Sequence, residues 1–307
     1  MNGVRWGIVG AGSIAGSVAG DFQFVPGAEL VAIASRNQEK ADAFALQQGI
    51  PKAFGSYRDL LESPEVDAVY IATPHPQHRD VALAAIANGK HVLVEKAFTA
   101  TLAGAQQVVD AARVKGVFAM EALWTRFLPV VAAAREVVAW GRIGHVVAVQ
   151  GDLYAYREFE AGNRLFEPEL GGGAILDLGV YLVNLAQMFL GDVKSIDCMT
   201  RLFSNGVEKA AAITLAHTAH GLSSLTCGFD GPGPGRMLVV GTKGWIEIEP
   251  RFHHPSVITI HRPGVLPRVI EAPPAGAATA TSSRRRPNGS PRAPPSPRRC
   301  RSATRSR

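Results

Sequence analysis

The sequence predicts an α/β fold: an N-terminal doubly wound parallel (Rossmann) sheet, followed by an α+β domain with an open, mainly antiparallel sheet. Between Val4 and about Leu123, short apolar runs rich in β-branched residues alternate with helix-like stretches, and a glycine-rich turn follows the first run. After Trp124, several alternating strands follow one another with Gly and Pro turns. Alternation of strand and helix is typical of a parallel sheet covered on both faces, whereas successive strands favour an antiparallel one.

The N-terminal part, residues 1–123, is expected to be one nucleotide-binding domain. Its continuous apolar strands need cover on both faces, and right-handed crossovers supply it. The expected strands are 4–10, 29–35, 67–73, 90–98 and 117–123, and the expected helices are 37–49, 77–89 and 102–116, with a further helix starting after the glycine-rich turn.

The second domain is expected to cover residues 124–272. A helix is expected at 130–141, and a glycine-rich turn leads into a long apolar helix at 171–191. The expected strands of the second sheet are 145–156, 193–203, 210–218, 221–229, 236–242, 245–250 and 256–263. Their succession favours an open antiparallel sheet.

The charge of the chain is divided unevenly. The formal net charge is +6, but residues 273–307 hold nine arginines and no acid. Residues 1–272 therefore carry 23 basic and 26 acidic side chains and are mildly acidic. The tail is rich in Pro, Ala, Ser and Arg and is expected to be disordered, since it cannot bury enough apolar surface to offset its ordering entropy.

Two interpretations of the tail remain open. Its arginines could contact the phosphates of a nucleic acid, but it has no lysines and no aromatic residues for stacking bases, so no nucleic-acid partner is expected. Arg, Pro, Ala, Gly and Ser are residues of GC-rich codons, so the alternative is out-of-frame translation that begins near 275–281.

The rest of the composition indicates a globular cytoplasmic protein. No apolar run approaches the roughly 20 residues of a membrane span, and the N-terminus does not resemble a signal peptide. The three cysteines are odd in number and lack C-x-x-C spacing, which is typical of free thiols in a reducing compartment.

The segment Gly10-Ala11-Gly12-Ser13-Ile14-Ala15 matches the dinucleotide-binding pattern G-x-G-x-x-A between a strand and a helix. The first glycine permits the tight turn, the second lets the backbone approach a pyrophosphate, and the small third residue lets helix and strand pack. The phosphates would lie at the helix N-terminus. A bare structural turn is the alternative, but the flanking strands and helix favour a cofactor site.

The end of the second strand favours NADP over NAD, with NAD left possible. An NAD site places an acidic side chain there to bind the ribose hydroxyls. This chain instead has Ser35 and Arg36, with Lys40 one helical turn later. A guanidinium can pair with a 2′-phosphate through two hydrogen bonds. The alternative for Arg36 is a solvent-exposed residue at the start of a helix.

Polar residues follow two further strands of the predicted sheet. Thr73 and Pro74 come after one strand, and Glu95 and Lys96 end another. Ligands of open α/β sheets lie beyond the carboxyl ends of the strands, so these residues are expected to line the cofactor site.

The segments GAGSIA, YIATPHPQH, KHVLVEKAFT and GGGAILDLGVY together resemble the glucose-fructose oxidoreductase/inositol dehydrogenase (Gfo/Idh/MocA) family. MEALWTRFLP (120–129) is most similar to the branch that contains dimeric dihydrodiol dehydrogenase and NADP-dependent xylose dehydrogenase. The resemblance covers residues 4 to about 272. It implies an oxidoreductase that acts on a sugar or polyol, and a homodimer or higher oligomer that forms through the second sheet.

The resemblance also implies the catalytic residues. Lys96 matches the lysine of the family's E-K-P motif, although Ala97 stands where the family has proline. Asp177 and Tyr181 match a pair on the helix after the glycines, where most relatives have histidine and this branch has tyrosine. Positions four apart share one helix face, so both can reach one cleft. We expect Tyr181 to exchange the proton and Lys96 to lower its pKa.

Further candidates are weaker. His78 matches a histidine that the family commonly has near the nicotinamide, and Trp124 and Arg126 are expected to contact substrate, although Trp124 could equally pack at a domain interface. His75 and His78 lack further ligands at zinc spacing, so no metal is expected. A protein that binds the cofactor as a non-catalytic sensor is the other alternative, which retention of Lys96, Asp177 and Tyr181 disfavours. Substrate identity stays open among sugars, cyclitols and trans-dihydrodiols.

Overall fold

The computed structural model describes residues 3–273 and contains two sheets. The first sheet has six parallel strands in the order β3-β2-β1-β4-β5-β6. They are β1 (Val4–Val9), β2 (Ala28–Ala34), β3 (Lys52–Phe54), β4 (Ala68–Ile71), β5 (His91–Glu95) and β6 (Ala119–Ala122). The predicted Rossmann sheet is confirmed. The three-residue edge strand β3 was not predicted from sequence.

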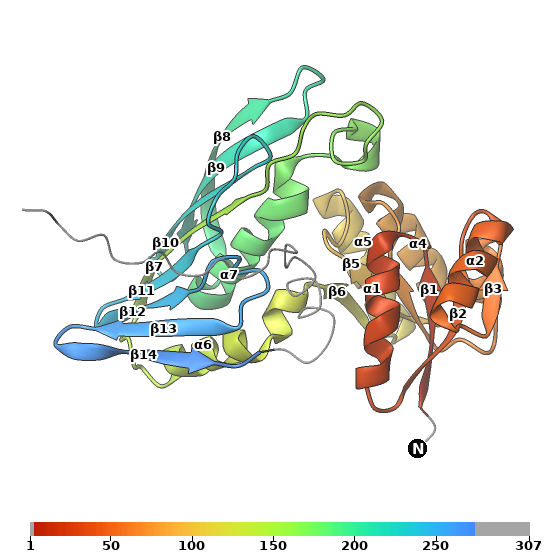
Figure 1. Cartoon of the computed structure of the whole chain (residues 1–307), viewed down its shortest axis with the longest axis horizontal. Coiled ribbons are helices and arrows are strands. Elements are labelled where there is room, and N and C mark those ends of the chain that lie inside the picture. The colour runs from red at the N-terminus through yellow and green to blue at the C-terminus, as the bar shows by residue number, and fades with distance from the viewer. Residues whose placement is uncertain (1–2, 274–307) are drawn as a thin grey trace, which may run out of the picture.

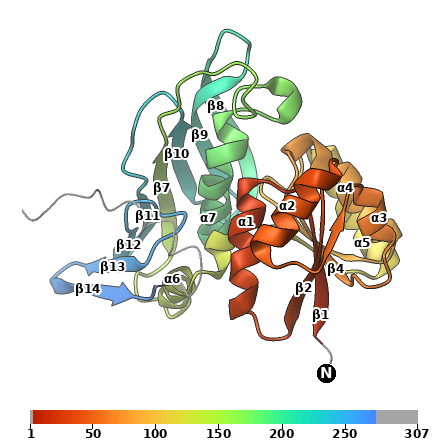
Figure 2. The same cartoon turned by 45° about the vertical axis from the view of Figure 1, so that its right-hand side comes forward.

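Helices cover both faces of this sheet (Figures 1 and 2). They are α1 (Ser13–Asp21), α2 (Gln38–Gln48), α3 (Tyr57–Glu62), α4 (His75–Ala87) and α5 (Leu102–Lys115). α1 and α2 contribute to one apolar cluster, whereas α3, α4 and α5 contribute to another. The strand order changes direction between β1 and β4, and the carboxyl ends of the strands on both sides of that point face one edge.

Local sequence explains where the helices begin and end. Asn37 caps α2 by accepting a hydrogen bond from the Lys40 amide at 2.8 Å, and Thr101 caps α5 in the same way through Gly104 at 3.1 Å. α5 ends at Gly116, whose φ of 71° is the left-handed conformation that glycine adopts without strain.

The second sheet has eight strands in the order β14-β13-β12-β11-β7-β10-β9-β8. They are β7 (Val146–Tyr154), β8 (Val193–Leu202), β9 (Glu208–His217), β10 (Leu222–Gly228), β11 (Met237–Gly241), β12 (Gly244–Ile248), β13 (Val257–Arg262) and β14 (Val265–Glu271). Neighbouring strands are antiparallel except for the parallel pair β7 and β10. The predicted open, mainly antiparallel sheet is confirmed, and its edge strand β14 was not predicted from sequence.

Two helices, α6 (Pro129–Ala139) and α7 (Val180–Leu190), pack on one face of this sheet in a single apolar cluster. α7 lies between the second sheet and the nucleotide-binding domain (Figures 1 and 2). The helical segments from Pro168 to Leu190 are together long and apolar enough to cross a membrane, with a mean hydropathy of 1.5. However, Leu182, Leu185 and Ala186 are fully buried in the core, as in the central helix of a folded domain.

A π-helical turn, Ile175–Gly179, precedes α7. The sequence predicts one continuous helix here, whereas the first turn is widened and Asp177 lies within it. Such turns interrupt the regular ladder of backbone hydrogen bonds and occur frequently at functional sites. The predicted tail, residues 273–307, lies outside the described residues apart from Pro273.

Candidate active site

A cleft of about 660 Å³ lies where the strand ends of the first sheet meet the π-helical turn and α7. Most of the residues predicted to bind cofactor or substrate line it. The lining residues are Gly10, Ala11, Gly12, Ser13, Ile14, Ser17, Ser35, Arg36, Lys40, Tyr57, Ala72, Thr73, Pro74, His75, Glu95, Lys96, Ala122, Trp124, Arg164, Asp177 and Tyr181. The structure therefore brings the glycine-rich turn and the predicted catalytic residues into one cavity.

The glycine-rich turn fits a dinucleotide phosphate. Gly10 has a φ of 105°, and a Cβ there would lie 2.8 Å from the carbonyl oxygen of Ala72, so the turn requires glycine. A Cβ on Gly12 would meet no atom within 4 Å, which leaves the backbone at the start of α1 open to the cleft. The first turn of α1 holds no acidic residue, and Ala15 is fully buried.

A further sign of a ligand is the hydroxyl of Thr73. Its Oγ1 is buried and has no hydrogen-bond partner among the described residues. Buried polar atoms are normally paired, so an unpaired one in the wall of a cleft is well explained by a polar ligand.

The residues that follow β2 form the opposite end of the cleft. Ser35 is buried, and its amide donates to the carbonyl of Phe54 at 3.0 Å. Arg36 and Lys40 are exposed and line the cavity with Tyr57. Tyr57 was not predicted from sequence, because neither β3 nor α3, the elements that position this ring, was expected.

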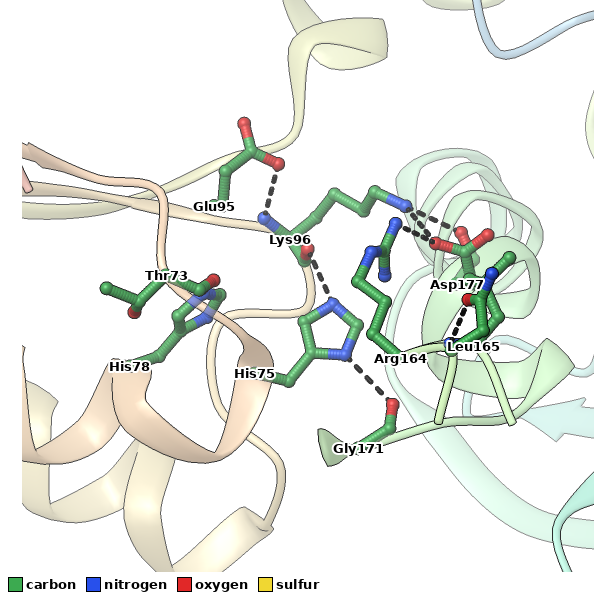
Figure 3. Close-up of polar contacts among 10 residues, drawn as sticks. Thr73, His75, His78, Glu95, Lys96, Arg164, Leu165, Gly171 and Asp177 are labelled. Atoms are coloured by element: carbon green, nitrogen blue, oxygen red, sulfur yellow. Dashed lines mark hydrogen bonds and ion pairs between the residues drawn. The ribbon is translucent and has the colours of Figure 1, made fainter. Parts of the chain in front are cut away.

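Lys96 extends from the turn after β5 towards the second domain (Figure 3). Its Nζ donates to the backbone carbonyl of Asp177 at 2.7 Å and to the Oδ1 of the same residue at 3.1 Å. Both side chains are about five-sixths buried, with exposures of 16% and 17%. The predicted convergence of Lys96 and Asp177 is therefore present.

A second cation approaches the same carboxylate. A guanidinium nitrogen of Arg164 lies 3.7 Å from Oδ1 of Asp177 (Figure 3). Burial raises the pKa of Asp177, but the attraction of Lys96 and Arg164 outweighs it and the net shift is downward. The carboxylate is thus ionised at neutral pH. Arg164 lies in an irregular segment between β7 and the π-helical turn, and no sequence motif marks it.

Tyr181 lies in the first turn of α7 and is 6% exposed. The Nζ of Lys96 is 5.0 Å from the centroid of its ring. Burial raises the pKa of Tyr181 strongly, and the carboxylates of Glu95 and Asp177 raise it further. The prediction that Lys96 lowers this pKa is wrong, because burial and then the nearby carboxylates raise it, and the ammonium is paired with Asp177.

Glu95, the last residue of β5, lines the cleft. The Tyr70 hydroxyl donates to its Oε1 at 2.5 Å, and its Oε2 accepts from the Lys96 amide at 3.1 Å. Burial raises the pKa of Glu95 despite these hydrogen bonds. An adjoining cavity of about 460 Å³, lined mainly by apolar side chains, shares Glu95 and Trp124 with the cleft.

The prediction that His78 lines the cofactor site is wrong. His78 is fully buried, and its ring lies between the carbonyl oxygens of Thr73, at 2.7 Å, and Ala97, at 2.9 Å. It supports the turn that carries Lys96, in which the Lys96–Ala97 peptide bond is cis. His75 is the histidine that lines the cleft, between the carbonyl oxygens of Lys96 and Gly171, each at 3.1 Å (Figure 3).

The two predicted substrate contacts differ. Trp124, in the short 3-10 helix Trp124–Phe127, lines the cleft, whereas Arg126 is exposed and does not. His253, between β12 and β13, was not predicted as a site residue, although its ring centroid lies 5.3 Å from that of Tyr181. Only the tertiary fold brings it there. Within residues 3–273, no three His, Cys, Asp or Glu side chains cluster as metal ligands would.

Comparison with known proteins identifies the family. Residues 4–123 match the model of an oxidoreductase family with an NAD-binding Rossmann fold, and residues 131–247 match the Gfo/Idh/MocA C-terminal domain. The chain belongs to the Gfo/Idh/MocA oxidoreductase family. The resemblance inferred from its motifs is confirmed, and the N-terminal domain is an NAD(P)-binding domain.

Two similar Gfo/Idh/MocA relatives are named trans-1,2-dihydrobenzene-1,2-diol dehydrogenase. The one from Mus musculus is 37% identical over 252 residues, which is 80% of this chain and 74% of the relative. The one from Danio rerio is 34% identical over 262 residues, 84% of this chain and 78% of the relative.

Solved structures of similar fold include two enzymes. A 3-ketoreductase from Actinomadura kijaniata, in complex with NADP and TDP-benzene, is 27% identical, with a TM-score of 0.79. The match covers 92% of this chain and 88% of the 3-ketoreductase chain. A levoglucosan dehydrogenase in complex with NADH and levoglucosan has a TM-score of 0.82 at 20% identity, which shows a shared fold. The match covers 90% of this chain and 82% of the levoglucosan dehydrogenase chain.

Proposed function

We propose that the protein is an NADP-dependent oxidoreductase that transfers hydride between the nicotinamide and a carbinol of a sugar, cyclitol or trans-dihydrodiol. One observation carries the proposal: Lys96 from the nucleotide-binding domain contacts Asp177 and lies 5.0 Å from the ring of Tyr181, in the cleft that holds the glycine-rich turn. The bound nicotinamide supplies the hydride acceptor or donor. The protein has to position the carbinol and move its proton.

Tyr181 is the proposed proton-transfer group. Its raised pKa keeps the phenol protonated near neutral pH, which suits a proton donor for carbonyl reduction. The same oxygen accepts the proton when the alcohol is oxidised. Oxidation is therefore faster at higher pH, where more of the phenol is deprotonated. Lys96 polarises the substrate oxygen, and Asp177 holds the ammonium in place from the second domain.

The choice of NADP rests on the residues after β2. Arg36 and Lys40 line the cleft, and Ser35 stands where NAD-specific sites carry an acid. Two cations and no carboxylate at this position favour a 2′-phosphate. NAD is the alternative cofactor.

The substrate class rests on the relatives. Enzymes named for dihydrodiols are 34% to 37% identical to this chain, and a 3-ketoreductase shares its fold at 27% identity. A cyclic substrate with vicinal hydroxyl groups is common to the sugars, cyclitols and dihydrodiols.

The test is NADP⁺ and NAD⁺ reduction, followed at 340 nm, across aldoses including xylose, cyclitols and trans-dihydrodiols. We expect turnover of at least one member, with a higher kcat/KM for NADP⁺. Intact NADP⁺ binding with no turnover across the panel, in either direction, would refute the proposal and leave a cofactor-binding sensor as the better explanation.

We also propose a homodimer formed through the outer face of the second sheet. On this face β8 exposes Met199, β10 exposes Leu222 and β12 exposes Trp245, with 79%, 56% and 40% of their surface accessible. Apolar side chains gathered on one sheet face favour a protein interface. Light scattering after gel filtration should give twice the chain mass, and Met199→Lys should reduce it to one chain mass.

A further inference from the structure

Two buried polar atoms beside the phenol of Tyr181 have no hydrogen-bond partner among the described residues. They are Nε1 of Trp124 and Nδ1 of His253. The rings of His253 and Tyr181 are 5.3 Å apart, and Trp124 and Tyr181 line the same cleft. A buried donor without an acceptor is costly and rare, so the indole N–H requires an explanation.

The indole is held in place from two directions. The hydroxyl of Thr125, which is fully buried, donates to the carbonyl of His253 at 2.6 Å, and this hydrogen bond joins the segments that carry the two rings. Trp124 also packs against the apolar core of the second domain. The indole therefore cannot turn towards another acceptor without disturbing this packing.

Tyr181, which lines the same cleft as Trp124, offers the indole a hydroxyl acceptor. Burial, and then the carboxylates of Glu95, Asp177 and Glu121, raise the pKa of Tyr181, whereas the indole of Trp124 lowers it. The indole N–H nevertheless forms no hydrogen bond in this structure. A negative charge on the phenol oxygen would attract the N–H and complete the bond.

Resting on the proposed function, we infer that Trp124 is a positioning residue whose indole N–H donates to the Tyr181 oxygen when that oxygen is an anion. This hydrogen bond is stronger when the Tyr181 oxygen is an anion than when it is a neutral hydroxyl. An interaction that strengthens as Tyr181 loses its proton speeds the proton-transfer step and not only the binding of the substrate. This role differs from the substrate contact predicted for Trp124 from sequence.

The direct test replaces Tyr181 with 3,5-difluorotyrosine, a stronger acid than tyrosine, in protein with ¹⁵N-labelled tryptophan. The chain has four tryptophans, and Trp124→Phe identifies the Trp124 indole resonance. We expect this resonance to move downfield along the titration curve of the fluorines at position 181. Trp140, 66% exposed, is the internal control and should not move. A Trp124 resonance that stays constant through the titration overturns the inference.

A second measurement separates this role from packing. Benzothienylalanine at position 124 keeps the ring shape and replaces the N–H by sulfur. We expect it to raise the pKa of the fluorotyrosine by about one unit, the effect of one hydrogen bond. Trp140→Phe should leave that pKa unchanged. An unchanged pKa in the benzothienylalanine protein overturns the inference.

Kinetics give a third readout. Benzothienylalanine at position 124 should lower kcat about tenfold, with KM within about twofold. A rise in KM alone would make Trp124 a substrate contact and overturn the inference. The two titrations need no turnover, so a protein inactive on every substrate would refute the proposed function and still give a result for Trp124.

Discussion

The ammonium nitrogen of Lys96 lies 2.7 Å from the backbone carbonyl oxygen of Asp177 and 3.1 Å from its Oδ1. A side chain of the nucleotide-binding domain is thus fixed by the π-helical turn of the following domain. Because both groups are largely buried, salt screens this pair less than a surface pair. The contact couples the position of Lys96 to the packing of the two domains.

Asp177→Asn should separate the charge of this contact from its geometry. The amide retains an oxygen for Lys96, while the loss of the carboxylate removes a negative charge that raises the pKa of Tyr181. We expect the pH range over which the rate of alcohol oxidation increases to move to lower pH. The pH profile of kcat/KM measures this, and a shift to higher pH would contradict the assigned electrostatics.

Tyr181→Phe should abolish most turnover. Removal of a proton-transfer group typically costs a factor of about 10² to 10⁴ in rate, and the ring itself, packed in the core, is retained. NADPH affinity, followed by fluorescence titration, should change little. Tyr156→Phe is the matched control, since Tyr156 is 59% exposed and does not line the cleft. Equal loss in both variants would remove Tyr181 from the mechanism.

Gly12→Ala should weaken cofactor binding without unfolding the protein. Gly12 has φ and ψ of −95° and 179°, which alanine adopts readily, and the added Cβ meets no protein atom within 4 Å. The methyl group would instead occupy space needed by the phosphates. We expect an unchanged Tm and an increase of about tenfold in the Kd for the cofactor.

The control for Gly12→Ala is Gly20→Ala. This glycine lies in the same helix, and its added Cβ also meets no atom within 4 Å. Alanine is the better helix former by roughly 0.5–1 kcal/mol, so stability should rise and the cofactor Kd should stay constant. A cofactor Kd that stays constant in Gly12→Ala as well would argue against phosphate binding at this turn.

Arg36→Ala tests the preference for NADP. Hydrogen bonds to a charged group are worth roughly 1.5–3 kcal/mol, so we expect the Kd for NADP⁺ to rise about 10- to 100-fold while that for NAD⁺ is unchanged. Arg58→Ala, outside the cleft and paired with Glu62, serves as the control. Equal weakening of both cofactors would mean that Arg36 does not contact the 2′-phosphate.

Stability should fall as the pH drops below about 6.5. Burial lowers the pKa of His75, His78 and His253, the last to about 3, from an ordinary value of 6.5. Above pH 6.5 these rings are neutral in both states. Below it the unfolded chain takes up protons that the folded protein does not, which favours unfolding, by ~1.4 kcal/mol per pH unit for His253.

Urea unfolding at pH 7.5 and 5.5 measures this effect. His253→Phe keeps the ring against Tyr181 and should reduce the difference in unfolding free energy between the two pH values. His145→Phe, at an exposed position, should not. An equal pH dependence in wild type and His253→Phe would show that this histidine titrates normally in the folded protein.

The nucleotide-binding half of the site could be predicted from sequence because its determinants are local. Gly10 and Lys96 directly follow a strand, Gly12 and Thr73 come within three residues of one, and the parallel topology places all such positions at one edge. Motif and strand pattern therefore identify the cleft without knowledge of any side-chain packing. Asp177 and Tyr181 came from family resemblance and not from local physics.

The catalytic half was decided by tertiary structure. Lys96 and Asp177 are 81 residues apart, and Arg164 and His253 come from irregular segments without a motif. His75 lines the cleft and His78 does not, because the packing of the fold buries the His78 ring completely. The direction of the Tyr181 pKa shift depends on burial and on three surrounding carboxylates. Sequence determines which groups lie at a strand end, because that order is local, whereas distances and desolvation arise only when the two domains pack together.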